Sequence, residues 1–188
     1  MHYIKYHNNK DYPSPVLIKP DIFQDDRGYF FESFNEKKFN ENVANIRFIQ
    51  DNESKSSYGV LRGLHFQKPP YDQAKLVRVI NGSVIDVVVD IRKRSPFYGQ
   101  YYHAFLSEEN HRQLFVPRGF AHGFLSLKDN TIFQYKCDNF YNKESEGAVY
   151  FNDPDINIPW GELIHFEDII LSDKDKLNKL LEDIENPF

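Results

Sequence analysis

The chain contains 188 residues with a formal net charge of −5 at pH 7, which argues against a general nucleic-acid binder. Its single cysteine excludes an internal disulfide and is typical of the cytoplasm, and no apolar run approaches the ~18 residues of a membrane helix. We therefore expect no nucleic-acid or membrane partner. No repeat or linker divides the chain, so we expect a single domain over residues 1–188.

Short apolar runs separated by turn residues predict an all-β sandwich or barrel with helices packed outside. Aromatic residues, 16% of the chain, are numerous enough to fill such an interior. The expected strands are 15–19, 28–34, 46–51, 59–67, 75–80, 83–91, 101–107, 112–116, 122–127, 131–138 and 147–151.

Two helices are expected outside the strands. One is a short peripheral helix over 35–43. The other is a C-terminal helix after Ser172, because the apolar residues that follow are spaced to form one stripe. The stripe consists of Leu177, Leu180, Leu181 and Ile184.

Two polar segments precede the central strands. In 25–34 (DDRGYFFESF), Arg27 and Glu32 accompany three phenylalanines. This pattern fits either a solvated edge strand or an arm that offers a cation to a phosphate and rings to a base. Further along, Gln50, Asp51 and Asn52 fit either a polar turn or a ligand-binding edge.

The segment 59–75 (GVLRGLHFQKPPYDQAK) carries the strongest chemical pattern. Arg62 can hold an anion, His65 can accept a proton near neutral pH, and Lys75 can stabilise an oxyanion. In an unbroken strand Arg62 and His65 point to opposite faces, so Gly63 must bend the chain if both line one pocket.

The dipeptide Asn81-Gly82 lies between the apolar runs 75–80 and 83–91, which predicts a β-hairpin with a type I′ turn. In that register Lys75 pairs with Val88 and lies diagonally to Asp86 on one face. The pair is then either a structural ion pair or a contact in which Asp86 positions the lysine.

A second histidine, His122, occurs in 116–124 (VPRGFAHGF), and with His65 it resembles a degenerate form of the two cupin motifs. Gln67 stands where those motifs have another metal-binding histidine, and the neighbouring cationic side chains disfavour a bound cation. We therefore expect a cupin without metal. A metal-dependent cupin enzyme using His65, Asp72 and His122 remains an alternative.

The strand 131–138 places Thr131, Phe133, Tyr135 and Cys137 on one face. Tyr135 is either a core aromatic whose hydroxyl finds a partner or a phenol that points into the barrel and gives a proton. Spacing alone favours the core aromatic.

Taken together, these segments resemble the dTDP-4-dehydrorhamnose 3,5-epimerase family of cupin-like sugar-nucleotide enzymes. The matching pieces run in family order through most of the chain. They are DDRGYFFESF, FIQDNESKSSYGVLRGLHFQ, KLVRVINGSVIDVVVDIR, RQLFVPRGFAHGF, YKCDNFYNKESEG, FNDPDINIPW and LSDKD.

The resemblance implies a jelly-roll β-barrel that acts as a homodimer with exchanged N-terminal strands and uses no metal or organic cofactor. The implied reaction is epimerisation of a dTDP-linked 4-keto-6-deoxyhexose at C3 and C5. Epimerisation at C3 only or C5 only is an alternative, because related enzymes with much the same residues do either. A nucleotide-sugar binding protein without catalysis is a further alternative.

The resemblance also implies roles for individual residues. His65 is the general base, held by Asp175; Lys75 stabilises the enolate oxygen with help from His122; and Tyr135 returns a proton to the opposite face. The positions expected to hold the nucleotide and sugar are Arg27, Glu32, Gln50, Asp51, Asn52, Arg62, Lys75, His122, Glu146 and Lys174, with Tyr141 stacked near the thymine. The segment around 165–168 is longer than the family's spacing before Lys174 and Asp175.

Overall fold

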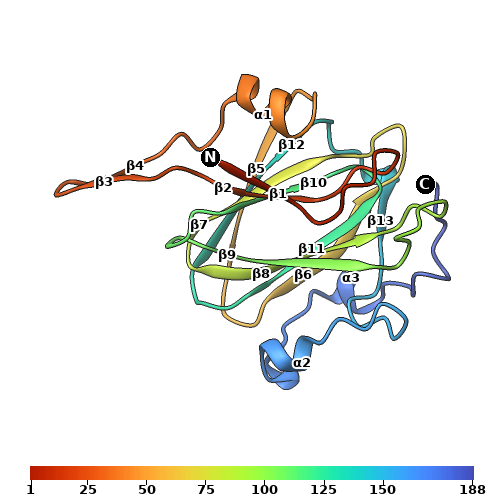
Figure 1. Cartoon of the computed structure of the whole chain (residues 1–188). Coiled ribbons are helices and arrows are strands. Elements are labelled where there is room, and N and C mark those ends of the chain that lie inside the picture. Colours follow the sequence, from red (N-terminus) through yellow and green to blue (C-terminus); the bar gives the residue numbers. More distant parts are fainter.

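The computed structural model describes residues 1–188 and consists of two antiparallel sheets that face each other (Figure 1). The six-stranded sheet contains, in spatial order, β1 (His2–Lys5), β2 (Val16–Lys19), β10 (Gln113–Val116), β7 (Lys75–Asn81), β12 (Thr131–Cys137) and β5 (Gln50–Ser56). The five-stranded sheet contains β13 (Glu146–Ala148), β6 (Leu61–Gln67), β11 (Phe120–Ser126), β8 (Ser83–Asp90) and β9 (Tyr101–Ser107). The predicted all-β jelly-roll class is confirmed, as two facing sheets that do not close into one continuous barrel.

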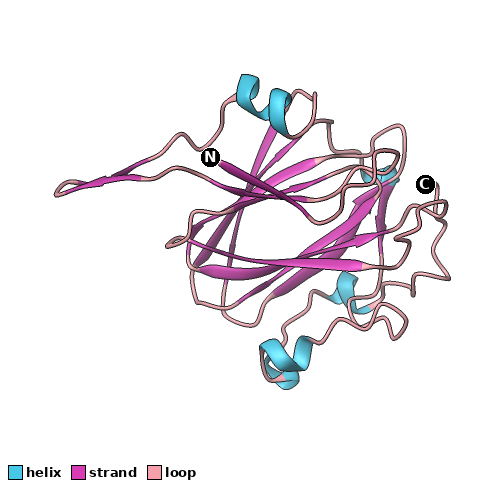
Figure 2. Ribbon diagram, viewed as in Figure 1, coloured by secondary structure: helices cyan, strands magenta, loops and turns pink.

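Three apolar clusters hold these layers together. Between the sheets, Val77 and Leu114 of one sheet pack with Val84 and Val88 of the other, and all four are almost fully buried. The outer face of the six-stranded sheet is covered by α1 (Glu36–Asn42) and the residues that follow it. The outer face of the five-stranded sheet is covered by residues 149–188, including α2 (Trp160–Leu163), which Figure 2 shows below the sheets.

Most expected strands are present within a few residues of their predicted bounds, and the predicted helix at 35–43 is confirmed as α1. Its N-cap is Asn35, whose side chain accepts a hydrogen bond from the backbone N–H of Lys38. The prediction missed β1, and it placed β5 too early, at 46 in place of Gln50. None of the helices is long and apolar enough to cross a membrane.

The predicted hairpin at Asn81-Gly82 is wrong. Strand β7 pairs with β10 and β12, so Lys75 lies opposite Val116 and Cys137, whereas β8 belongs to the facing sheet. Gly82 has φ +84° and lies at the corner where the chain passes from one sheet to the other. A glycine with positive φ suits both a corner between two sheets and a two-residue hairpin turn. The dipeptide Asn81-Gly82 alone therefore does not tell these two structures apart.

The predicted C-terminal helix begins where expected, after Ser172, but the predicted length is wrong. Only one turn forms, α3 (Asp173–Lys176), capped by Ser172, and Leu177 is 82% exposed. Beyond it the backbone is held by tertiary contacts: Lys179 O accepts from the Tyr150 N–H, and the Leu181 N–H donates to Asp153. These bonds to the layer beneath replace the hydrogen bonds of a continuing helix.

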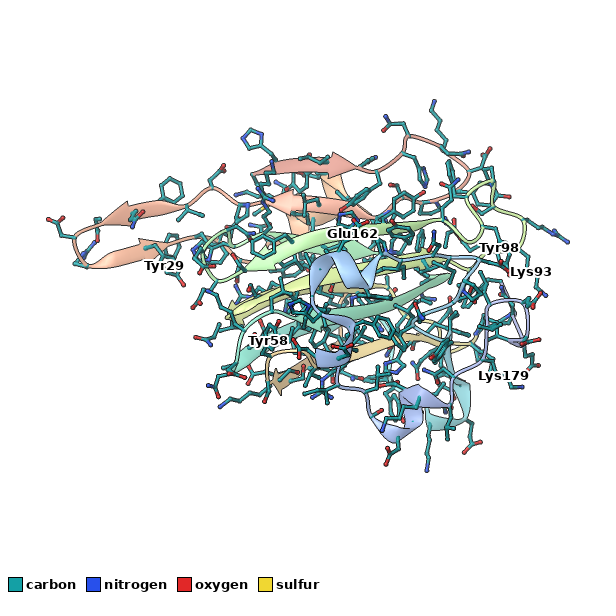
Figure 3. The ribbon with its side chains drawn as sticks, turned by 90° about the horizontal axis from the view of Figure 1, so that it is seen from below. Tyr29, Tyr58, Lys93, Tyr98, Glu162 and Lys179 are labelled. Atoms are coloured by element: carbon teal, nitrogen blue, oxygen red, sulfur yellow. The ribbon has the colours of Figure 1, made fainter.

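A two-stranded arm projects away from the sandwich. It consists of β3 (Phe23–Asp25) and β4 (Gly28–Phe30), and only β4 was expected. Its rings face solvent: Phe23 is 66% and Phe30 69% exposed. Figure 3 shows Tyr29 on this arm, and its ring packs against His111 of the loop before β10, with ring centroids 4.5 Å apart.

Candidate active site

A cleft opens between the two sheets. It consists of two adjoining cavities of about 350 and 480 Å³ that share the side chains of His65, Lys75, Tyr135 and Lys174. His65 comes from β6 of the five-stranded sheet, whereas Lys75 and Tyr135 come from β7 and β12 of the six-stranded sheet. The residues singled out for proton chemistry therefore meet in one space, with the base candidate on one wall and the lysine and phenol on the other.

His65 is held by a carboxylate. Its Nε2 lies 2.6 Å from Oδ1 of Asp175, which is 4% exposed. Asp175 Oδ2 also accepts a hydrogen bond from the hydroxyl of Ser172, the residue that caps α3. Burial acts to raise the pKa of Asp175, but the hydrogen bonds from His65 and Ser172 outweigh it and hold the pKa below its usual range.

The segment 165–168, where the resemblance implies a longer spacing, leaves this contact intact. It contains the short 3-10 turn η2 (Phe166–Asp168), where Phe166 stacks on Phe151 with ring centroids 6.0 Å apart. The segment therefore packs within the C-terminal cover of the five-stranded sheet.

The bend expected at Gly63 is present. Its φ is +146°, and the pairing of β6 with β11 shifts register beside it, so that His65 lies opposite His122 and Arg62 opposite Phe124. Arg62 and His65 both line the larger cavity as a result. A Cβ at position 63 would lie 2.6 Å from Cα of Gly123, so the bend requires glycine.

A second histidine–carboxylate pair lies deeper in the cleft. His122 Nε2 is 3.0 and 2.9 Å from the two carboxylate oxygens of Asp86, whose side chain is fully buried. Burial raises the pKa of Asp86, and the nearby His122 and Lys75 oppose that rise. Asp86 and Lys75 thus lie on facing sheets rather than diagonally within one sheet, and the direct ionic partner of Asp86 is His122.

Lys75 extends from β7 into the cleft, where it lines both cavities. Burial lowers the pKa of its ammonium group, and the neighbouring Cys137 and Asp86 act in the opposite direction. Cys137 is itself fully buried, and burial raises the pKa of its thiol to about 11.

Tyr135 faces the cleft with its ring centroid 5.8 Å from Nζ of Lys75. Burial raises the pKa of its hydroxyl above the usual 10.0, so the phenol keeps its proton at neutral pH and can donate it. The expected shared face of β12 is present, since Phe133 and Cys137 are buried on the same side.

One end of the cleft is polar and suits an extended anion. Arg62 donates to Ser56 Oγ and Lys55 O on β5, and Lys174 forms an ion pair with Glu146 across the cleft rim. Arg62 lines the larger cavity, whereas Tyr141, which is 54% exposed, lines the smaller cavity together with Glu146; Lys174 lines both. The side chains that complete this end are Gln50 and Asn52.

Three of the predicted binding residues are not brought into the cleft of their own chain. Arg27 is on the arm, is ion-paired with Asp25 and has a side chain 90% exposed, and Glu32 is paired with Lys38. Asp51 alternates with Gln50 and Asn52 along β5, so it points to the opposite face, where it pairs with Lys136.

The alternative metal set does not assemble either. Asp72 forms an ion pair with Arg118 and lines neither cavity, while His65 and His122 each contact a different aspartate. No group of three or more His, Cys, Asp or Glu residues has an arrangement suited to a metal ion.

Several cleft residues were not predicted to bind substrate. Gln67 could have been found from the two-residue repeat of β6, because it shares a face with His65. Ser54 shares the face of β5 that carries Gln50 and Asn52, so the same repeat could have found it. Gln73 and Asn178 also line the cleft, but an uncharged amide outside a strand gives no chemical signal by itself.

This fold and this site define a cupin-like enzyme that performs acid–base chemistry on a small molecule bound between two sheets. The chain belongs to the dTDP-4-dehydrorhamnose 3,5-epimerase family, whose sequence description matches residues 10–183.

Individual relatives agree with this membership. The dTDP-4-dehydrorhamnose 3,5-epimerase of Methanothermobacter thermautotrophicus is 51% identical over 172 residues, covering 92% of this chain and 91% of the relative. The crystal structure of the Elizabethkingia anophelis epimerase superposes with a TM-score of 0.87 at 51% identity, covering 99% of this chain and 100% of that one. The Legionella pneumophila enzyme in complex with dTDP-4-keto-L-rhamnose gives a TM-score of 0.90 at 43% identity, covering 98% and 94%.

Proposed function

We propose that this protein epimerises a dTDP-linked 4-keto-6-deoxyhexose at C3 and C5, converting dTDP-4-dehydro-6-deoxyglucose to dTDP-4-dehydrorhamnose. The observation that carries the proposal is that His65 and Tyr135 enter one cleft from facing sheets, with Lys75 beside the phenol. A sugar ring between the sheets then meets a base on one face and an acid on the other. The ligand of the Legionella relative supports this substrate class.

The reaction follows from the arrangement. His65 removes the proton from the carbon next to the C4 ketone, and the electron pair of the broken C–H bond moves to the ketone oxygen as an enolate. The Lys75 ammonium group and His122 stabilise that charge, and Asp175 stabilises the imidazolium. Tyr135 then gives its proton to the opposite face of the same carbon, which inverts the configuration. His65 then releases its proton to solvent and Tyr135 regains one from solvent. The same steps at the second carbon complete the reaction, and no metal or organic cofactor takes part in them.

The polar end of the cleft is suited to the nucleotide. Arg62 and Lys174 supply positive charge for the diphosphate, and the exposed ring of Tyr141 supplies a stacking surface for thymine. Gln50, Asn52 and Glu146 offer hydrogen bonds to the remaining polar groups.

The arm supports a homodimer with exchanged N-terminal strands. Phe23 and Phe30 near its end are mostly exposed, and Arg27 and Glu32 do not line the cleft of their own chain, which leaves them to act on a partner's cleft. This arrangement predicts complementation between two inactive variants. A mixed dimer of Arg27→Ala and His65→Ala chains regains one complete site, whereas mixing restores no activity if each arm serves its own chain.

The main test is incubation of the purified protein with the keto-sugar nucleotide in heavy water, followed by NMR. Deuterium at both C3 and C5 with inversion supports the proposal, and deuterium at one carbon identifies a single-site epimerase. The His65→Ala variant should fold and bind dTDP but incorporate no deuterium. Turnover that disappears after dialysis against a chelator and returns with added metal would favour the metal-dependent alternative.

The sequence properties also support a cellular location and a domain organisation. The reduced, buried Cys137 and the biosynthetic role of the family support a cytoplasmic enzyme. The family match over residues 10–183 supports a single functional domain over 1–188.

A further inference from the structure

Gln67 lies on β6, two residues beyond His65, and its side chain forms three hydrogen bonds to backbone groups. Its Nε2 donates to Tyr71 O at 2.8 Å and to Phe140 O at 3.3 Å. Its Oε1 accepts from the Asn142 N–H at 2.7 Å. Two of the three bonds are therefore made to the residues immediately before and after Tyr141.

These contacts leave Gln67 with no donor for a ligand. A primary amide has two N–H groups, and both are used by loop carbonyls. Gln67 lines the cleft and is 7% exposed, yet both of its N–H donors bond to backbone carbonyls of the protein. It acts through other residues rather than on the substrate.

The loop that carries Tyr141 depends on side-chain amides for its position. The Tyr141 N–H donates to Gln50 Oε1 at 3.2 Å, and Gln67 binds the peptide groups on both sides. Tyr141 itself is 54% exposed and belongs to none of the apolar clusters. Packing therefore does not fix its ring: the hydroxyl lies beside Glu146, and the amide contacts fix the backbone from which the ring projects.

We propose that Gln67 is the positioning residue for Tyr141 and thereby sets the affinity of the cleft for the nucleobase. This inference rests on the proposed function, in which Tyr141 stacks on thymine. The role requires an amide at this position. An imidazole cannot donate to two carbonyls while it accepts from an N–H, and a carboxylate would face two carbonyl oxygens with no proton to offer.

The test uses the full-length protein and two near-isosteric variants, Gln67→Glu and Gln67→Met. Each should raise the Kd of dTDP, measured by calorimetry, and the KM of the keto-sugar nucleotide by about tenfold, because stacking is lost when the loop moves. The value of kcat should stay within about twofold, since His65 and Lys75 are untouched. Gln134→Met is the matched control, because Gln134 bonds Arg78 on the other face of β12 and should leave the Kd unchanged.

A double-variant cycle separates positioning from other roles. In a Tyr141→Ala background, Gln67→Met should produce no further rise in the Kd of dTDP, because the ring that it positions is absent. Equal and additive effects in the two backgrounds would overturn the proposal, as would a fall in kcat with the Kd unchanged. The dTDP measurement does not depend on turnover. A protein that binds dTDP as described but incorporates no deuterium would refute the proposed reaction and leave this inference standing.

Discussion

His65 and Asp175 are 110 residues apart in the chain, and Nε2 of His65 lies 2.6 Å from Oδ1 of Asp175. When the buried carboxylate accepts a hydrogen bond from the Nε2–H group, the lone pair of the neutral ring is on Nδ1. No hydrogen bond of the protein occupies Nδ1, so it is the atom available to the substrate. The contact thus selects both the orientation and the tautomer of the proposed base.

Asp175→Asn should lower kcat by about 10²–10³-fold with little change in KM, because an amide neither stabilises the imidazolium nor enforces the Nε2–H tautomer. Steady-state kinetics of the variant check this. Asp173→Asn is the control: Asp173 lies on the same helical turn, is fully exposed and should be dispensable. An Asp175→Asn enzyme with normal kcat would show that His65 acts without its carboxylate.

Tyr135→Phe should separate the two halves of the reaction. The base, lysine and nucleotide contacts remain, so the substrate still exchanges hydrogen with heavy water, but delivery to the opposite face loses its donor. NMR should therefore show deuterium incorporation without a matching yield of inverted sugar. Tyr102→Phe is the control, because the Tyr102 hydroxyl is buried without a partner and lines neither cavity. Full inversion by Tyr135→Phe would assign the acid to another group.

The value of kcat should fall at a lower alkaline pH than it would if Lys75 had the pKa of an exposed lysine. Burial lowers the pKa of Lys75 below 10.5, and the charged form is the one that stabilises the enolate, so kcat is lost as pH rises through the lowered pKa. Asp86 opposes the lowering, so Asp86→Asn should move the alkaline limb of the kcat profile to still lower pH. A limb that stays in place would mean that Asp86 does not act on Lys75.

Gly63→Ala should destabilise the fold by about 2–3 kcal/mol or more and reduce activity further than the loss of folded protein explains. A side chain there meets Gly123 at 2.6 Å and requires φ +146°, so β6 must straighten and turn either Arg62 or His65 out of the cleft. Denaturant unfolding and kinetics on the folded fraction measure the two effects. Gly161→Ala, where a Cβ meets nothing within 4 Å, should be neutral.

Local patterns predicted much of this structure because local chemistry decides it. Alternating apolar residues identified most strands, Asn35 began α1, and the side-chain directions of Arg62 and His65 required the bend at Gly63. Each of these depends on a few neighbouring residues.

The failures occurred where distant contacts compete with local preference. The partners of β7 lie at Val116 and Cys137, which no turn signal at Asn81-Gly82 reveals. The stripe after Ser172 is helical in its spacing, but backbone bonds to Tyr150 and Asp153 hold the segment in another conformation. The contact of Asp175 with His65 was expected from family resemblance alone, because no spacing rule connects them.

Cys137 can serve as a built-in probe of the motions of the native protein. It is the only thiol of the chain, is fully buried, and lies on β12 between the strands that carry Lys75 and Asn52. With its pKa raised to about 11, the thiol is both shielded and protonated, and alkylating reagents need it to be exposed before they react. The rate at which iodoacetamide labels the native protein therefore measures how often this wall of the cleft opens, without any introduced probe.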